Sequence, residues 1–290
     1  MADQFESAGG ELRFVRGAWI HSSAEIADDV TIEPGAFIGP GVRIGRGSTI
    51  QSGAILRRDT ILGQRNRVHA TAVLGDDPQD TQYRGEPTRL EIGDDNVFRE
   101  GVTIHRGSTK EEGVTRIGNG NYFMAQSHVG HDTVVEDHCV FANGVLIAGH
   151  CRIGSAVNLS GGAALVQFVT VGRFAFLGGL AGCRQDVEPF WRHDAVGDGC
   201  RATPIGVNSV GLRRGGFSED VIRMLVLAYR ILTSNDKGGD LGLRVRALRE
   251  KDLWCDEIEE LVEFLRRKGA GRYGIQRRRR APTDTDEGVE

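Results

Sequence analysis

Three histidines lie close together in the sequence and are suited to acid–base chemistry. His128, His131 and His150 share one short stretch of the chain, and Asp132 directly follows His131. A neutral histidine, with an ordinary pKa of about 6.5, is the natural general base at physiological pH, and a neighbouring carbonyl or carboxylate can fix its tautomer. We therefore favour a functional role for these three. Ordinary surface positions are expected for three others: His69, His138 and His193.

A repeat of six residues must position these side chains. Apolar residues stand at every sixth position over 20–74 and 92–104, and in a new phase over 117–177. A helix needs apolar residues every three or four positions and an ordinary strand every second one. A period of six is instead typical of a parallel β-helix built from hexapeptide repeats. The sequence thus predicts an all-β left-handed parallel β-helix, followed by a small α-helical C-terminal domain.

The coil of this β-helix brings the histidines together. Three hexads make one coil, so each residue should stack under its equivalent in the next coil, about 4.8 Å away. His131 and His150 are separated by one coil plus one position and should lie on neighbouring coils, several ångströms from each other. His131 follows the inward Val129 by two positions, which should direct it outward.

Composition excludes several classes of protein. The chain has 290 residues and a net charge of −4, which argues against a nucleic-acid partner. Its five Cys include no CxxC pair, so a structural zinc site is not expected. The N-terminus lacks a secretion signal pattern, and no apolar run reaches membrane-spanning length. We expect a cytoplasmic protein without stable membrane insertion.

Two interruptions and a change of period divide the chain. The first loop, 76–91, leaves the phase of six intact, and the second, 105–116, shifts it by one. Loops that leave a strict scaffold are usually functional. From Phe217 the pattern becomes helical, with Ser218 as the expected N-cap. The predicted organisation is a flexible N-terminus (1–13), the β-helix (14–188), an irregular connecting segment (189–216), the α-helical domain (217–275) and a disordered tail (276–290).

Five segments resemble one enzyme family. They are GEPTRLEIGDDNVFRE (85–100), VTIHRGST (102–109), HVGHDTVV (128–135), LIAGH (146–150) and ATPIGVNSVGLRR (202–214). Together they resemble the UDP-N-acetylglucosamine O-acyltransferases of lipid A biosynthesis. The resemblance covers almost the whole chain and implies a homotrimer. The implied reaction transfers an (R)-3-hydroxyacyl chain from acyl carrier protein to the 3-hydroxyl of UDP-N-acetylglucosamine, without a cofactor or metal.

The resemblance also implies residue roles. His131 matches the general base, Asp132 the group that holds its imidazole, and the backbone N–H of Gly149 the oxyanion donor. No covalent acyl-enzyme is implied. Gly179 matches the position that limits the acyl groove and suggests a chain of about myristoyl length. The matching substrate-binding positions are His128, His150 and Asp80 for the sugar, Gln167 and Asn208 for the nucleotide side, and Arg214 for a phosphate.

Some positions depart from the family pattern. Val166 stands where a His is usual, Val210 where an acidic residue is usual, and Gly215 where a second basic residue is common. Gln82 replaces a usual Lys and Arg201 a usual His. These changes gather on the nucleotide side. They leave open an acceptor with a modified sugar, such as a 3-amino sugar nucleotide.

Three other readings stay open from the sequence. One is the related N-acyltransferase that acts on the 3-O-acylated sugar, although the chain lacks room before Ile20 for its uridine-binding domain. Another is a zinc enzyme of the same fold, whose His spacing differs from the one seen here. The third is a non-catalytic scaffold. The acidic carrier protein would dock on basic residues, with these candidates: Arg99, Arg106, Arg173, Arg184 and the pairs at 213–214 and 266–267.

Overall fold

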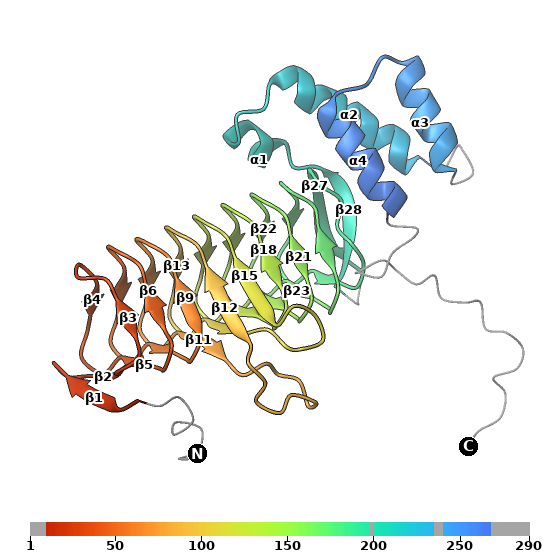
Figure 1. Ribbon diagram of the computed structural model, residues 1–290. Coiled ribbons are helices and arrows are strands. Elements are labelled where there is room, and N and C mark those ends of the chain that lie inside the picture. The colour runs from red at the N-terminus through yellow and green to blue at the C-terminus, as the bar shows by residue number, and fades with distance from the viewer. Residues whose placement is uncertain (1–9, 198–199, 235–239, 268–290) are drawn as a thin grey trace, which may run out of the picture.

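The computed structural model describes residues 10–197, 200–234 and 240–267. The expected tail at 276–290, with the run of arginines at 277–280, lies outside the described residues, as does most of the expected flexible N-terminus. The described chain forms the predicted left-handed parallel β-helix, capped at its C-terminal end by helices (Figure 1).

The β-helix has three faces, each a ladder of short parallel strands. Face 1 contains β2 (Ala18–His21), β5 (Phe37–Ile38), β8 (Ile55–Leu56), β11 (Val73–Asp76), β14 (Thr103–His105), β17 (His128–Val129), β20 (Leu146–Ile147), β23 (Ala164–Leu165) and β26 (Gly182–Cys183). Face 2 contains β3 (Glu25–Ile26), β6 (Arg43–Ile44), β9 (Thr60–Leu62), β12 (Arg89–Ile92), β15 (Val114–Ile117), β18 (Val134–Val135), β21 (Arg152–Ile153) and β24 (Thr170–Val171). Face 3 contains β4 (Thr31–Ile32), β7 (Thr49–Ile50), β10 (Arg67–Val68), β13 (Val97–Phe98), β16 (Tyr122–Phe123), β19 (Val140–Phe141), β22 (Asn158–Leu159) and β25 (Phe176–Leu177).

The register of the ladders explains the change of phase in the sequence. Val129 pairs with Ile147, so an uninterrupted coil contains three hexads. Leu62 pairs with Ile92 across the first loop, and Ile104 pairs with Val129 across the second. The first loop therefore lengthens its coil by two whole hexads, whereas the second adds one hexad and a single further residue. Only the second loop shifts the repeat, because only its length is not a multiple of six.

The repeated apolar residues fill the coil interior. The rings of Phe98, Phe123 and Phe141 stack along the axis, with centroids 5.1 and 4.8 Å apart. Small residues occupy the remaining inward positions, among them Cys139 and Cys151, which are completely buried. Burial raises the pKa of both thiols to about 12, so they stay protonated and act as packing groups.

The N-terminal end is less irregular than the sequence suggests. Strand β1 (Leu12–Val15) pairs antiparallel with β2, so Leu12 and Arg13 belong to a strand rather than to a flexible lead-in. Its few residues show too little alternation to be recognised alone, and the pairing with β2 supplies the hydrogen bonds that fix it.

The connecting segment was expected to be irregular, and that expectation is wrong. It forms the antiparallel hairpin β27 (Trp191–Val196) and β28 (Arg201–Val207), then the short helix α1 (Ser209–Arg214). Polar residues on β27 hide its alternation, and α1 is too short to show a helical period. His193, expected at the surface, is 4% exposed: it belongs to β27 itself, and Nε2 of its ring lies 3.1 Å from Oε2 of the buried Glu188 carboxylate.

The C-terminal helices lie beyond this hairpin (Figure 1). They are α2 (Glu219–Thr233), α3 (Leu241–Glu250) and α4 (Asp256–Arg267), and the Ser218 side chain caps α2 by accepting from the Val221 N–H. Trp191 and Leu212 join their apolar core, which ties the helices to the end of the coil. Within the described residues, no helix is both long and apolar enough to cross a bilayer.

Candidate active site

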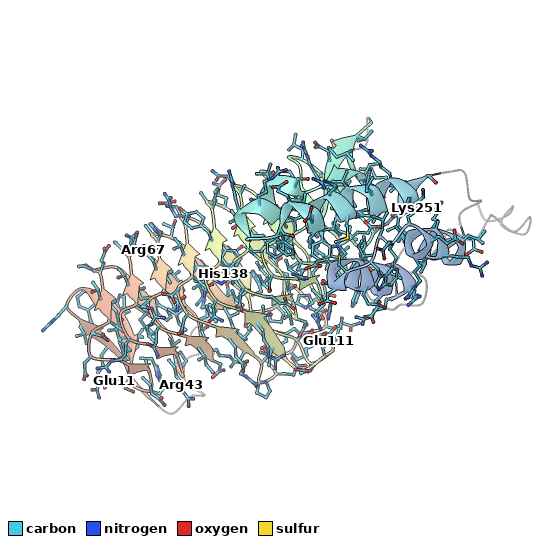
Figure 2. All side chains as sticks on the ribbon, turned by 90° about the horizontal axis from the view of Figure 1, so that it is seen from above. Glu11, Arg43, Arg67, Glu111, His138 and Lys251 are labelled. Atoms are coloured by element: carbon cyan, nitrogen blue, oxygen red, sulfur yellow. The ribbon has the colours of Figure 1, made fainter. Side chains whose placement is uncertain are left out.

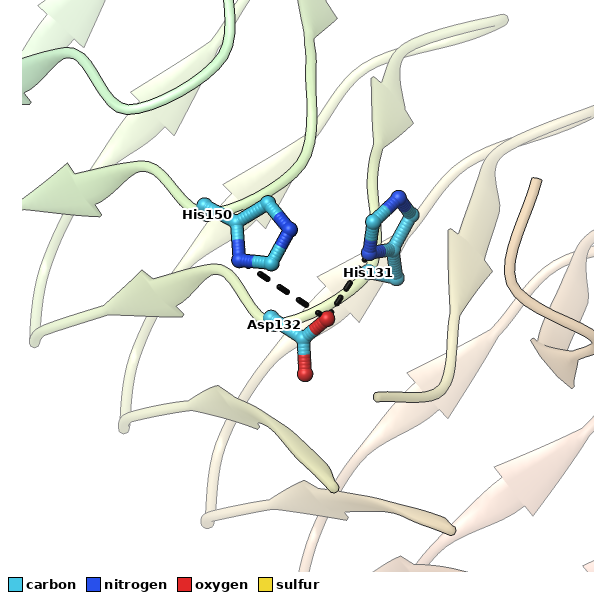
Figure 3. Close-up of side chains that lie close together, drawn as sticks. All are labelled: His131, Asp132 and His150. Carbon is cyan, nitrogen blue, oxygen red and sulfur yellow. Dashed lines mark hydrogen bonds and ion pairs between the residues drawn. The ribbon is translucent and has the colours of Figure 1, made fainter. Parts of the chain in front are cut away.

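One corner of the coil carries the predicted chemical residues. Asp132, His150 and Phe168 occupy the same position in successive coils and all adopt left-handed backbone angles, with φ of 60°, 63° and 67°. Because these positions are one coil apart, the three side chains stack above one another. His131 immediately precedes this column, and the rings of His131 and His150 meet edge to face with centroids 4.9 Å apart (Figure 3). The prediction that the two histidines lie on neighbouring coils is thus confirmed.

His131 and Asp132 form a hydrogen-bonded pair. The Nδ1 atom of His131 is 2.8 Å from Oδ2 of Asp132. Asp132 also accepts from the Ser108 N–H at 2.8 Å and from the Ser108 hydroxyl at 2.6 Å. Burial acts to raise the pKa of Asp132, but the hydrogen bonds from His131 and Ser108 outweigh it and lower the pKa. An ionised Asp132 accepts a hydrogen bond from the Nδ1–H of His131, which leaves Nε2 free to take a proton.

Gly149 lies against the reactive edge of His131. A Cβ atom at Gly149 would be 2.9 Å from both Cε1 and Nε2 of that ring, closer than real contacts allow. Only glycine therefore fits there without moving the imidazole. Within the described residues the Gly149 N–H donates no hydrogen bond, because the coil leaves this turn position unpaired. A free N–H beside the Nε2 edge is the arrangement that an oxyanion donor needs.

His150 is held by groups from two other segments. Its Nδ1 lies 2.9 Å from Oε1 of Glu111 and 3.8 Å from Oδ2 of Asp132. Its ring stacks on Phe168 with centroids 4.6 Å apart. His150 is only 4% exposed and His131 only 5%, although both point away from the coil interior. The second loop covers them, which outward direction alone did not predict.

The second loop supplies residues that the sequence did not single out. Ser108 holds Asp132, Glu111 holds His150, and Lys110 places its Nζ 2.7 Å from Oδ2 of Asp80. Its departure from the strict repeat marked this loop as functional. Nothing in the sequence indicates which of its side chains reach back to the coil.

Asp80 brings the first loop to the same region. Hydrogen bonds from Lys110 and from the Gln82 N–H, with a smaller contribution from nearby His131, lower the pKa of its carboxyl. Asp80 is therefore an anion at physiological pH, at the edge of the site. The lysine that pairs with Asp80 is Lys110 of the second loop, whereas Gln82 of the first loop contributes its backbone N–H.

His128 lies on β17, the strand of face 1 that directly precedes His131 in the chain. Its Nδ1 is 2.8 Å from the Thr103 hydroxyl, and its ring meets His105 edge to face at 5.2 Å. Burial, with the charges of His105 and His131, lowers the pKa of His128 to about 4. A neutral His128 can bind a substrate hydroxyl as hydrogen-bond partner but adds no positive charge at physiological pH.

This pKa shift predicts a stability change with pH. Between pH 6.5 and about 4 the unfolded chain protonates His128 while the folded chain does not, so the free energy of unfolding should fall as pH drops through this range. In His128→Gln this part of the fall should disappear. Urea unfolding of both proteins at pH 7 and pH 5 measures the difference. An identical pH dependence in the two would show that His128 titrates normally in the folded chain.

The predicted nucleotide-side residues do not gather here within one chain. Asn208 caps α1 by accepting from the Gly211 N–H at 3.1 Å, and its amide donates to the Phe174 carbonyl at 2.9 Å. Arg214 is exposed in the last turn of α1, which lies at the C-terminal end of the coil, away from the two loops (Figure 1). Gln167 is exposed beside Phe168 and is nearer the site.

Val166 and Val210 are exposed apolar side chains, 45% and 58% accessible. Neither side chain offers a polar atom that could form a hydrogen bond. Arg213 is engaged by Glu219 at 2.6 Å. Arg106, a candidate for carrier docking, is 3% exposed and donates to the Gly75 carbonyl at 2.8 Å, so it is unavailable for a partner.

His131, Asp132 and His150 bring three potential metal-ligand atoms within 4.8 Å of one another. The donor chemistry nevertheless fits a proton relay better than a metal. Both Nδ1 atoms face carboxylates and must be N–H donors there, and Asp132 already accepts from Ser108. A metal ion would have to displace both protons and the serine.

Comparisons with known proteins agree with one another. A family model described as UDP N-acetylglucosamine O-acyltransferase, domain 2, matches residues 186–275, and a bacterial transferase hexapeptide model matches 115–149. An acyl-[acyl-carrier-protein]–UDP-N-acetylglucosamine O-acyltransferase from Thiobacillus denitrificans is 43% identical, over 88% of this chain and 96% of the relative. One from Stutzerimonas stutzeri is 41% identical over 83% and 94%.

Solved structures show the same likeness. A UDP-N-acetylglucosamine acyltransferase from Bacteroides fragilis has a TM-score of 0.83 and 32% identity, covering 91% of this chain and 100% of that one. An enzyme from Acinetobacter baumannii has a TM-score of 0.81 and 33% identity, covering 91% and 99%. The similarity thus includes most of the coil and of the C-terminal helices.

Proposed function

The chain belongs to the UDP-N-acetylglucosamine O-acyltransferase family, and from that premise we propose how its own residues carry out the reaction. The protein transfers an acyl chain from acyl carrier protein to UDP-N-acetylglucosamine, the first step of lipid A biosynthesis. The acyl group is an (R)-3-hydroxyacyl chain and the acceptor is the sugar 3-hydroxyl. The reaction takes place in the cytoplasm. The observation that carries the mechanism is the His131–Asp132 pair with its Nε2 edge against Gly149.

His131 acts as the general base. Its Nε2 takes the proton of the sugar hydroxyl as that oxygen attacks the thioester carbonyl carbon. Ionised Asp132 keeps the Nδ1 proton in place and stabilises the imidazolium that forms. The N–H of Gly149 donates to the carbonyl oxygen as it becomes negative. Collapse of the intermediate expels the carrier's sulfur, which recovers the proton from His131.

Direct transfer fits the groups around His131. The Ser108 hydroxyl donates to Asp132 rather than to the base. Cys151 lies inside the coil, with its pKa raised to about 12 by burial, and cannot become a thiolate at neutral pH. Neither group is placed to form an acyl-enzyme. The sugar hydroxyl itself is therefore the nucleophile.

Asp80, His128 and His150 bind the sugar. They surround the base from the first loop, β17 and the neighbouring coil, and each offers a hydrogen-bonding atom. Gln167 and Asn208 bind the nucleotide side and Arg214 a phosphate. An Arg suits a pyrophosphate because its guanidinium gives charge-assisted paired hydrogen bonds.

A homotrimer would complete this site. Asn208 and Arg214 belong to the C-terminal end of the coil, away from the loops of the same chain, so a neighbouring chain would supply them. The outward residues at the start of face 1 are apolar and form a surface suited to packing against another copy. They are Trp19, Phe37, Ile55 and Val73. The mass of the purified protein in solution tests this assembly.

The acyl-transfer assay decides the proposed function. The full chain is given a panel of (R)-3-hydroxyacyl carrier proteins with UDP-N-acetylglucosamine or its 3-amino analogue. Ester formation on the ordinary sugar is the expected result. Transfer only to the amino sugar would overturn the O-acyl assignment and attribute the changes at Val166 and Val210 to a remodelled acceptor site. No transfer by folded protein to either acceptor would reject the proposal.

Gly179 sets the acyl chain length. It is exposed at a turn, and an added Cβ would meet only the Gly161 carbonyl oxygen, at an ordinary 3.5 Å, so the Cβ itself does not disturb the coil. Gly179→Met should shorten the preferred donor from about myristoyl length, because the new side chain fills the end of the groove. Competition between donors of different length measures the shift. The exposed neighbour gives a control, Leu180→Met, and unchanged selectivity in Gly179→Met would contradict the role.

A further inference from the structure

Glu111 joins three parts of the site. It lies in the loop between β14 and β15, and its side chain is 19% exposed. Oε1 faces Nδ1 of His150 at 2.9 Å, and Oε2 accepts from Nη2 of Arg152 at 2.5 Å. The same guanidinium donates through Nη1 to the Asp132 carbonyl at 2.6 Å. The Glu111 carboxylate and the Arg152 guanidinium thus connect the second loop to His150 and to the backbone of Asp132.

The imidazoles of His131 and His150 both lie near Oδ2 of Asp132 and can compete for it as a hydrogen-bond acceptor. Oδ2 of Asp132 lies 2.8 Å from Nδ1 of His131 and 3.8 Å from Nδ1 of His150 (Figure 3). Both rings need an acceptor for an Nδ1 proton. Only a small rotation of His150 separates it from a hydrogen bond to Asp132. Glu111 offers His150 a carboxylate at 2.9 Å instead.

We propose that Glu111 is a positioning residue of the transfer reaction, which accepts the Nδ1–H of His150 so that His150 does not compete with His131 for Asp132. This inference rests on the proposed function for its effect on rate. Glu111 also fixes the His150 tautomer, leaving Nε2 as an acceptor for a substrate hydroxyl. The positive charge of Arg152 balances the carboxylate of Glu111, so Glu111 adds no net negative charge beside Asp132.

The geometry can be tested without activity. In a crystal structure of the full chain carrying Glu111→Ala, Nδ1 of His150 should move to about 3 Å from Oδ2 of Asp132, a normal hydrogen-bond length. In Glu111→Gln, whose amide oxygen can still accept, His150 should stay in place. The next residue gives the matched control: Glu112 is exposed and pairs with Arg116 at 2.7 Å, so Glu112→Gln should change nothing at the site. His150 unmoved in Glu111→Ala would overturn the proposal.

Kinetics tests the consequence for catalysis. Glu111→Ala should lower kcat by about 10- to 100-fold with a smaller change in KM, because the base is misoriented while substrate groups remain. Glu111→Gln should recover most of the rate, and Glu112→Gln should match wild type. In an Asp132→Asn background the Glu111→Ala change should cost much less, since Glu111 acts through Asp132.

Two outcomes separate this inference from the proposed function. An equal loss of kcat from Glu111→Ala in both backgrounds would reject the positioning role and leave the acyltransferase intact. A wild type that transfers no acyl group would reject the proposed function, while the position of His150 in the crystal structures would still decide what Glu111 does.

Discussion

Replacing His131 with alanine should lower kcat for acyl transfer by about 10²- to 10⁴-fold, the usual contribution of a general base. The buried Asp132 would keep its hydrogen bonds from Ser108, so the coil should remain folded. His131→Gln can donate to Asp132 but cannot take a proton, and it should be as inactive as His131→Ala. Steady-state rates at saturating UDP-N-acetylglucosamine measure both.

A surface histidine provides the control for this result. His138 is exposed and lies apart from Glu111, which marks the site (Figure 2). His138→Ala should keep the wild-type rate. Full activity in a folded His131→Gln protein would show that another group takes the proton, and the mechanism proposed for Nε2 would then be wrong.

Replacing Gly149 with alanine should have an effect of similar size. The new Cβ would lie 2.9 Å from Nε2 of His131, so the imidazole must move from the position where it meets the hydroxyl. The methyl group would also crowd the free N–H, and loss of one oxyanion donor costs about 2.7–4 kcal/mol of transition-state stabilisation. We expect kcat to fall by at least about 10²-fold. Single-turnover transfer rates measure the chemical step directly.

The coil contains a matched glycine for comparison. Gly161 occupies the same turn position at another corner, and a Cβ there would meet only the Asn143 carbonyl oxygen, at an ordinary 3.5 Å. Because Gly161 lies next to Gly179, the comparison uses a short acyl donor that does not reach Gly179, and with it Gly161→Ala should react at the wild-type rate. If Gly149→Ala were equally active, the close contact with His131 would have no catalytic meaning.

The proposed nucleotide side draws on residues beyond the last coil. Asn208 has both ends of its amide engaged within its own chain, as the cap of α1 and the donor to Phe174. Its role toward the nucleotide, and that of Arg214, stay predictions that depend on a neighbouring chain. Repeat arithmetic cannot place these residues, because they lie beyond the last coil.

The period of six determined the architecture from sequence alone, because each hexad makes one strand and one corner whatever the distant chain does. The stacking of equivalent positions in successive coils then placed Asp132 beneath His150 and put His131 beside it. Even the unequal effects of the two loops on the phase followed from their lengths. Where a structure is a translation of one local unit, counting along the chain is enough to locate a neighbour.

Only the tertiary structure decided what closes over that corner. The loop that brings Ser108, Lys110 and Glu111 to the site has no period, so no spacing predicts which of its side chains return to the coil. The burial of His131 was missed for the same reason, since this loop covers it, and the burial of His193 was missed because its strand β27 lies outside the repeat. The repeat positions the proposed catalytic residues, and non-repeating segments folded back onto it determine their partners and their access to solvent.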